Sequence, residues 1–154
     1  SNTTVGTITS EGAFTAAVAG TTTINASAEG ITSNEATVTV SPEIVRINSW
    51  DLPATGSRGK AIDATVNITN TGTETIWFVV SVAGTSTTGE SIVGLGTIEL
   101  AAGATNDVHV KIPVPGDADA AGTYTLYPDV YTFDGYPDVG TLQATGSGDS
   151  IVIS

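Results

Sequence analysis

Apolar and polar side chains alternate along most of this chain with a period of two residues. The pattern is clearest in residues 61–70 and 76–82, where β-branched and aromatic side chains recur at every second position. Such a period places one face of a β-strand against a core and the other in water. Between the two stretches lies an Asn-Thr-Gly-Thr segment, and both Asn and Gly tolerate the positive φ of tight turns. We therefore predict a β-hairpin over residues 61–82, on which the later strands pack.

The same alternation continues through the rest of the chain, and no window of ten or more residues shows the 3.6-residue period of a helix. Besides the hairpin, the strands expected in the second part of the chain are residues 43–51, 91–100, 107–114, 123–133, 141–144 and 150–153. A Gly-Leu-Gly segment within residues 91–100 predicts a bulge or a crossover. About seven strands at this spacing indicate an all-β protein with an immunoglobulin-like β-sandwich.

Residues 1–41 contain only short strands, and they end at a Ser-Pro dipeptide that is typical of a joint between β-domains. These strands are expected at residues 7–9, 13–16, 22–28 and 36–40. Without a facing sheet they would leave Phe14, Ile24 and Val38 exposed and backbone edges unpaired. The sequence therefore predicts a partial immunoglobulin-like β-domain at 1–41 and a complete sandwich at 42–154. We expect the partial domain either to be an excerpt of a longer one or to be completed by a partner.

Composition adds limits on partners and location. Charged residues make up 13% of the chain against an ordinary share of about 25%, and Thr and Ser supply the missing polarity. Sixteen acidic residues against four basic ones give a net charge of -12, which excludes nucleic acids and anionic membrane surfaces as partners. The chain has no Cys. Its Thr-, Ser- and Gly-rich strands favour an extracellular or cell-surface location, and with no signal peptide or membrane-spanning run we expect a processed or excerpted segment.

The sequence offers no catalytic motif. His109 is the only histidine, and it falls on the outward face of a predicted strand, where a solvated role is the common one. There is no G-x-S-x-G or H-E-x-x-H motif, and one His without Cys cannot form an ordinary zinc site. The acidic residues are mostly single and in turns, unlike the facing carboxylates of a glycosidase. We therefore predict that the protein is not an enzyme and has no organic cofactor.

Calcium is the metal that the sequence favours over zinc. Asp117 and Asp119 lie in one predicted loop and Asp134 in another. Loop carboxylates and backbone carbonyls at the end of a sandwich can supply the six to eight oxygen ligands of Ca²⁺. No EF-hand spacing is present, and short acidic loops are more commonly only hydrated. Both interpretations of these three residues stay open.

Aromatic side chains suggest a second kind of site. Tyr127 and Tyr131 fall on the face of their predicted strand opposite its aliphatic residues, and Trp77 lies in the predicted hairpin. An exposed row of rings can stack on a sugar, so these three residues are a candidate sugar-binding platform. Packing in a sandwich core, or the hydrogen-bonded tyrosine corner of such folds, explains the same residues without a ligand.

Three N-glycosylation sequons are present, at Asn2, Asn25 and Asn67. The predicted strands place Asn25 and Asn67 on outward faces, as an attached glycan requires. Chance sequons are expected in a chain so rich in Thr. In an archaeal source we would expect at least one of them to be glycosylated.

Two segments resemble known families of surface modules. The pattern GAFTAxxAGTTTIxAxAxG, ending in ATVTV, resembles the C-terminal half of bacterial immunoglobulin-like domains of the second group, found in intimin-like adhesins, other surface proteins and phage tail proteins. In residues 61–133, VNITNTG, IELAAGATxxVxV and AGTYTLYPDV resemble the CARDB family, the cell-adhesion-related domains of bacteria and archaea. The acidic, Asn-rich ending of that family is replaced here by TGSGD, so no metal role is carried over.

These resemblances imply a non-enzymatic structural or adhesive module of a prokaryotic cell-surface assembly, such as an adhesin stalk, an S-layer or an extracellular filament. The expected partners are other copies of the chain or neighbouring immunoglobulin-like domains, joined by stacking and by shared strands. Two alternatives stay open. One is a carbohydrate-binding module of a secreted protein, with glycans as partners, and the other is a tail or decoration domain of a phage or virus.

Overall fold

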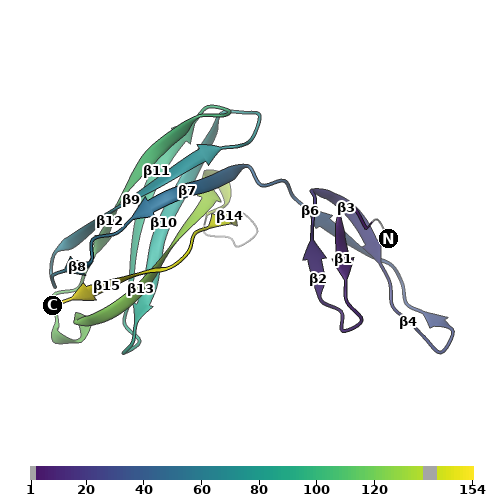
Figure 1. Cartoon of the computed structure of the whole chain (residues 1–154), viewed down its shortest axis with the longest axis horizontal. Coiled ribbons are helices and arrows are strands. Elements are labelled where there is room, and N and C mark those ends of the chain that lie inside the picture. Colours follow the sequence, from purple (N-terminus) through teal and green to yellow (C-terminus); the bar gives the residue numbers. More distant parts are fainter. Residues whose placement is uncertain (1–2, 137–141) are drawn as a thin grey trace. The chain divides into compact units, whose positions relative to one another are not determined.

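The computed structural model describes residues 3–136 and 142–154, and these form an all-β protein (Figure 1). The chain divides into two compact units, Ser1–Glu43 and Ile44–Ser154. The only helical elements among the described residues are two short 3₁₀ turns, η1 (Ala118–Ala120) and η2 (Phe133–Gly135). The predicted all-β fold is thereby confirmed.

The second unit is one hydrogen-bonded sheet that curls into two layers. In spatial order, its strands are β7 (Val45–Asp51), β9 (Ala61–Asn70), β12 (Thr105–Pro113), β11 (Ser91–Leu100), β10 (Ile76–Ser86), β13 (Gly122–Thr132), β15 (Asp149–Ile153) and β8 (Thr55–Gly56). A ninth strand, β14 (Leu142–Thr145), also pairs with β13. All pairs are antiparallel except β15 with β8. The first three strands form one layer of a β-sandwich, and β11, β10 and β13 belong to the other.

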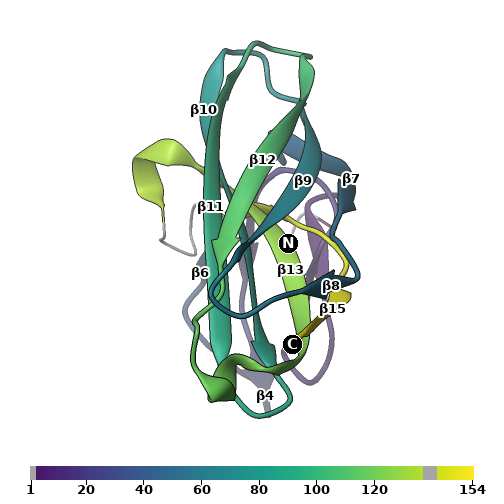
Figure 2. The same ribbon diagram turned by 90° about the vertical axis from the view of Figure 1, so that its left-hand side faces the viewer.

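The two layers are joined along the sheet where β11 passes β12 (Figure 2). Only one pair, Leu95 with Lys111, is in register between these strands. Glycine allows the close approach, because a Cβ atom on Gly94 would lie 2.5 Å from the Lys111 carbonyl oxygen and one on Gly96 would lie 2.8 Å from Val108 Cγ1. The bulge or crossover expected at residues 94–96 is therefore wrong, since β11 is continuous and in unbroken register with β10, and the glycines serve its contact with β12.

The predicted hairpin over residues 61–82 is also wrong, although both of its strands exist. β9 pairs with β7 and β12, whereas β10 pairs with β11 and β13, so the two strands lie in different layers. Alternation identifies the buried face of each strand but carries no information about its neighbour in the sheet. The segment between them, residues 71–75, crosses from one layer to the other.

Asn70 holds this crossover by hydrogen bonds rather than by an unusual backbone conformation. Neither Asn70 nor Gly72 has a positive φ. The fully buried Asn70 amide donates to the carbonyl oxygens of Glu74 (2.8 Å) and Leu100 (2.9 Å), and its Oδ1 accepts from the Gly72 backbone N–H (2.9 Å). The side chain thus connects the crossover to the end of β11, which explains why Asn stands at this turn.

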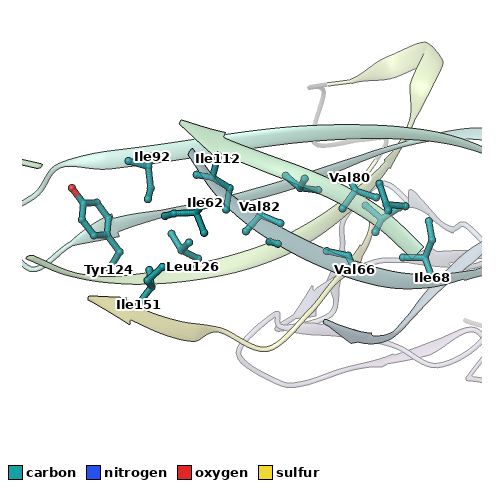
Figure 3. Packing of buried hydrophobic residues seen from close by; sticks show 14 of the residues in the cluster. Ile62, Val66, Ile68, Val80, Val82, Ile92, Ile112, Tyr124, Leu126 and Ile151 are labelled. Carbon is teal, nitrogen blue, oxygen red and sulfur yellow. The ribbon is translucent and has the colours of Figure 1, made fainter. Parts of the chain in front are cut away.

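The core of the second unit lies between its two layers (Figure 3). Side chains at alternate positions of β9, β10, β12 and β13 meet there, as the sequence pattern predicts. The fully buried members include Val66, Ile68, Phe78, Val80, Val82, Val110, Ile112, Tyr124, Leu126, Val130 and Ile151. The Tyr124 hydroxyl donates to the Ala120 carbonyl oxygen four residues upstream (3.0 Å), which is the geometry of a tyrosine corner at the start of a sandwich strand.

The first unit consists of three separate two-stranded sheets among its described residues. They pair β1 (Gly6–Ile8) with β2 (Phe14–Ala16), β3 (Gly20–Ile24) with β6 (Ala36–Val40), and β4 (Ser27–Ala28) with β5 (Ile31–Thr32). The single strand expected over residues 22–28 is therefore divided into β3 and β4. Val5 and Thr22 are its buried side chains in the described part of the chain, and Gly6 is buried beside them. Among these described residues there is no core comparable with that of the second unit.

Candidate interaction surfaces

The two outer faces of the second unit differ in chemistry. On β7, β9 and β12, exposed polar side chains are joined across neighbouring strands, and this surface is called here the polar face. Its pairs are Arg46 Nε to Asn48 Oδ1 (3.0 Å), Asn48 Nδ2 to Asn67 Oδ1 and to Thr69 Oγ1 (both 2.8 Å), Asn67 Nδ2 to Asp107 Oδ1 (2.6 Å), Thr65 Oγ1 with His109 Nδ1 (3.2 Å), Thr69 with Thr105 (2.6 Å), and Lys111 Nζ to Asp63 Oδ1 (2.9 Å). Polar groups that satisfy one another in this way need no partner.

The opposite surface is an apolar face built on β11, β10, β13 and β14. Six large apolar side chains of these strands and of η2 are exposed there: Trp77, Val93, Leu95, Tyr127, Phe133 and Leu142. Strand register places them on one side of the sheet, because paired residues point to the same side. Ala83 pairs with both Val93 and Tyr127, and Ser81, two residues away on the same side of β10, pairs with Leu95. Between them lie Val79 and Ser81, which point to the same side and are nevertheless buried. The exposed apolar side chains therefore share one face of the sheet, on which Glu99 and Asp129 also lie.

Two shallow hollows mark the ends of the apolar face. One, of about 890 Å³, lies beside Trp77 and Phe133 and includes Glu74 and Asp134 in its lining; we call it the Trp77 hollow. Its two rings have centroids 6.2 Å apart and are inclined by 58°. The other hollow, of about 570 Å³, lies beside Tyr127 and Leu142. Both are open enough for side chains of another molecule to enter.

The three predicted sugar-platform residues all lie on this side of the sheet but do not form one flat platform. Tyr127 pairs with Ala83, and Ala83 is six residues along β10 from Trp77. The rings of Trp77 and Tyr127 are therefore about 20 Å apart. Tyr131 lies between them and packs edge-on against Tyr136, with ring centroids 5.0 Å apart. Burial raises the Tyr131 pKa above its ordinary value of 10.0, the Asp129 carboxylate and Tyr136 raise it further, and a Ser81 hydrogen bond opposes them.

Sequence reasoning missed the aliphatic half of the apolar face. Because a bulge or a crossover was expected within residues 91–100, the outward positions of Val93 and Leu95 were not identified. Leu142 was missed because β14 is short. The signal was nevertheless present, because β11 has apolar side chains at both odd and even positions, with Ile92 buried and Val93 exposed. A strand that is apolar on both sides in a two-layer sandwich must present one of them to solvent or to a partner.

The predicted calcium ligands are not brought together. Asp117 and Asp119 lie just before β13, and Asp134 lies just after it, at the other end of an eleven-residue strand. The described residues contain no group of three or more His, Cys, Asp or Glu that could hold a metal ion. Asp117 instead accepts a hydrogen bond through Oδ1 from the Ala120 backbone N–H (3.1 Å), which closes the η1 turn.

The sequons and the histidine have distinct surroundings. Asn2 lies outside the described residues, and Asn25 is exposed between β3 and β4. Asn67 is half-buried, and its Nδ2 donates to Asp107 Oδ1 within the polar face, so a glycan there would take the place of the other amide hydrogen. His109 is exposed on β12, as the alternation predicts, and contacts Thr65.

The first unit leaves apolar side chains uncovered. Ile8, Val18 and Ile31 are exposed, Ile31 to 76%. A hollow of about 170 Å³ is lined by side chains that include Ile8, Phe14 and Ile24. An isolated two-stranded sheet is marginally stable in water, and each such sheet has two free edges. Further strands or another molecule would find both apolar surface and backbone partners here.

Within the part of the chain that the structure describes, no helix could cross a bilayer. The sequence matches no protein-family model, and no curated protein is significantly similar to it. The resemblances to bacterial immunoglobulin-like and CARDB domains therefore remain predictions from the quoted motifs.

Proposed function

We propose that this chain is a non-enzymatic structural and adhesive module of a prokaryotic cell-surface assembly. The observation that carries the proposal is the incomplete first unit, whose three two-stranded sheets leave Ile8, Val18 and Ile31 exposed. The second unit, by contrast, has a full core and serves as a rigid spacer. A chain that joins a complete sandwich to an incomplete one is suited to linear assembly, in which each incomplete unit gains strands from a neighbouring copy.

Strand sharing supplies both of the interactions that the first unit lacks. Added strands would pair with the free edges of its sheets by backbone hydrogen bonds and would cover the apolar side chains around the 170 Å³ hollow. The low content of charged residues and the Thr-rich strands agree with an extracellular module. The quoted resemblances to adhesin and cell-adhesion domains point to the same class of protein.

Sedimentation velocity of the full chain and of residues 44–154, between about 1 and 100 μM, tests the proposal. We expect the full chain to form oligomers whose share rises with concentration, and the shorter chain to remain monomeric, because its core is complete. Ile8→Asp should weaken assembly, since it places a charge in the surface to be covered. Thr21→Asp, on an already polar exposed position of β3, is the matched control. If both chains are monomeric and equally stable, strand sharing between copies is refuted.

A further inference from the structure

We propose that the apolar face of the second unit is a docking surface for a different protein, one whose contact surface carries apolar side chains together with Lys or Arg. A cationic side chain of this partner would lie over the Trp77–Phe133 ring pair in the Trp77 hollow. The proposal concerns the second unit alone and does not depend on strand sharing by the first.

The extent of the face fits a specific protein contact. β10 and β13 are eleven residues long and β11 is ten, which gives a surface about 35 Å by 15 Å before β14 is added. This is about 500 Å², with the polar positions Ser81, Glu99 and Asp129 included, against the roughly 800 Å² that each partner buries in a standard interface. Exposed apolar side chains that gather on one face of a soluble protein commonly mark an interaction site. Trp77 and Phe133, 49% and 52% exposed, are the kind of residue that dominates binding energy when covered.

Charge identifies the partner as basic. Four acidic residues border or enter the apolar face: Glu74 and Asp134 in the Trp77 hollow, Glu99 opposite Trp77, and Asp129 opposite Ser81. Of the chain's four basic residues, Lys111 lies opposite Leu95 at the border with β12 and is paired with Asp63 (2.9 Å), whereas Arg46 lies on the polar face and Arg58 and Lys60 lie between β8 and β9. Two copies placed face to face would therefore bring carboxylates together, and like charges opposite one another oppose docking. A partner with Lys or Arg around an apolar centre complements this surface.

The aliphatic residues favour a protein over a polysaccharide. Half of the exposed apolar side chains are Val93, Leu95 and Leu142, which have no ring on which a sugar could stack. Apolar side chains of a protein would bury all six residues equally well. The tilted rings of Trp77 and Phe133 lie at one end of the face, with the carboxylates of Glu74 and Asp134 beside them. A guanidinium or ammonium group would be attracted there by cation–π and ionic interactions.

The experiment uses the full chain labelled with ¹⁵N, because the indole N–H signals of Trp77 and Trp50 report the two tryptophans separately. The probe is the blocked tetrapeptide Arg-Leu-Arg-Leu, and its control is the isosteric peptide in which neutral citrulline replaces both arginines. We expect the arginine peptide to shift the Trp77 signal and to bind at least fivefold more tightly than the citrulline peptide. The combined substitutions Glu74→Gln and Asp134→Asn should remove that difference, whereas Glu90→Gln, outside the Trp77 hollow, should preserve it. Leu95→Ser should weaken both peptides.

Several results would overturn the proposal. Equal affinity for the two peptides, or no shift of Trp77 by either at 5 mM, would refute a basic partner. Tighter binding of cellohexaose or chitohexaose than of the arginine peptide, with the Trp77 signal shifting, would make the face a sugar site. Self-association of residues 44–154 that Leu95→Ser abolishes would make it an interface between copies.

Discussion

At the scale of single residues, Asn70 shows how one buried side chain can join segments that belong to different layers. Its amide reaches the carbonyl oxygens of Glu74 and Leu100, and its backbone carbonyl accepts from Gly103 (2.9 Å). The crossover after β9, the end of β11 and the turn before β12 therefore share one residue. A polar side chain at zero exposure is tolerated because its hydrogen bonds are made.

Asn70→Ala should lower the free energy of unfolding by about 1–3 kcal/mol, because it leaves the buried Leu100 carbonyl oxygen without its partner and removes the part-buried bonds to Glu74 and Gly72. Urea unfolding followed by tryptophan fluorescence measures the change. Asn48→Ala is the matched control, since that amide also makes three hydrogen bonds but is exposed, and its loss should cost no more than about 0.5 kcal/mol. Similar losses for both variants would show that the buried connections contribute little.

At the scale of elements, the sequence predicts strands better than it predicts their neighbours. The alternation of residues 61–70 places Ile62, Val66 and Ile68 in the core, and all three are buried there. The same alternation does not indicate which strands are hydrogen-bonded to each other. Two strands joined by a short segment are therefore predicted as a hairpin even when that segment crosses from one layer of the sandwich to the other. The apolar face was predictable only in part for a related reason. Aromatic residues on the outward positions of a strand are readily recognised as candidate binding residues. Val93 and Leu95, in contrast, are of the residue types that form cores, and only the arrangement of the two layers shows that they face outward.

The corner between β11 and β12 depends on glycines rather than on hydrogen bonds, because only one residue pair is in register there. Gly94→Ala should therefore destabilise the second unit by about 1–3 kcal/mol, since the added methyl group meets the Lys111 carbonyl and forces the strands apart. Gly116→Ala is the control, because its Cβ would have its nearest neighbour at 3.8 Å and the backbone there has no positive φ. Equal effects in thermal unfolding of the two variants would show that β11 can move away from β12 at no cost.

At the scale of the whole molecule, the two units differ in how they are stabilised. The core cluster draws all of its buried residues from the second unit, from Val45 to Ile153. The first unit, with Val5 and Thr22 as its buried side chains in the described ranges, depends on short sheets that cannot bury much apolar surface by themselves. This difference in core size could be predicted in part from the sequence, because no segment of residues 1–41 alternates between apolar and polar side chains over as many residues as 61–70 does.

We therefore expect the full chain to unfold in two steps that different probes separate. Both tryptophans, Trp50 and Trp77, belong to the second unit, so fluorescence follows that unit alone, whereas far-ultraviolet circular dichroism follows the strands of both. The fluorescence midpoint should not change with protein concentration. The additional step seen by circular dichroism should move to higher temperature as concentration rises. The proposed strand sharing between copies would stabilise the folded first unit by mass action, by about 2.7 kcal/mol at a hundredfold excess over the dissociation constant. Coincident transitions at every concentration would instead mean that the first unit folds with the second and gains nothing from its neighbours.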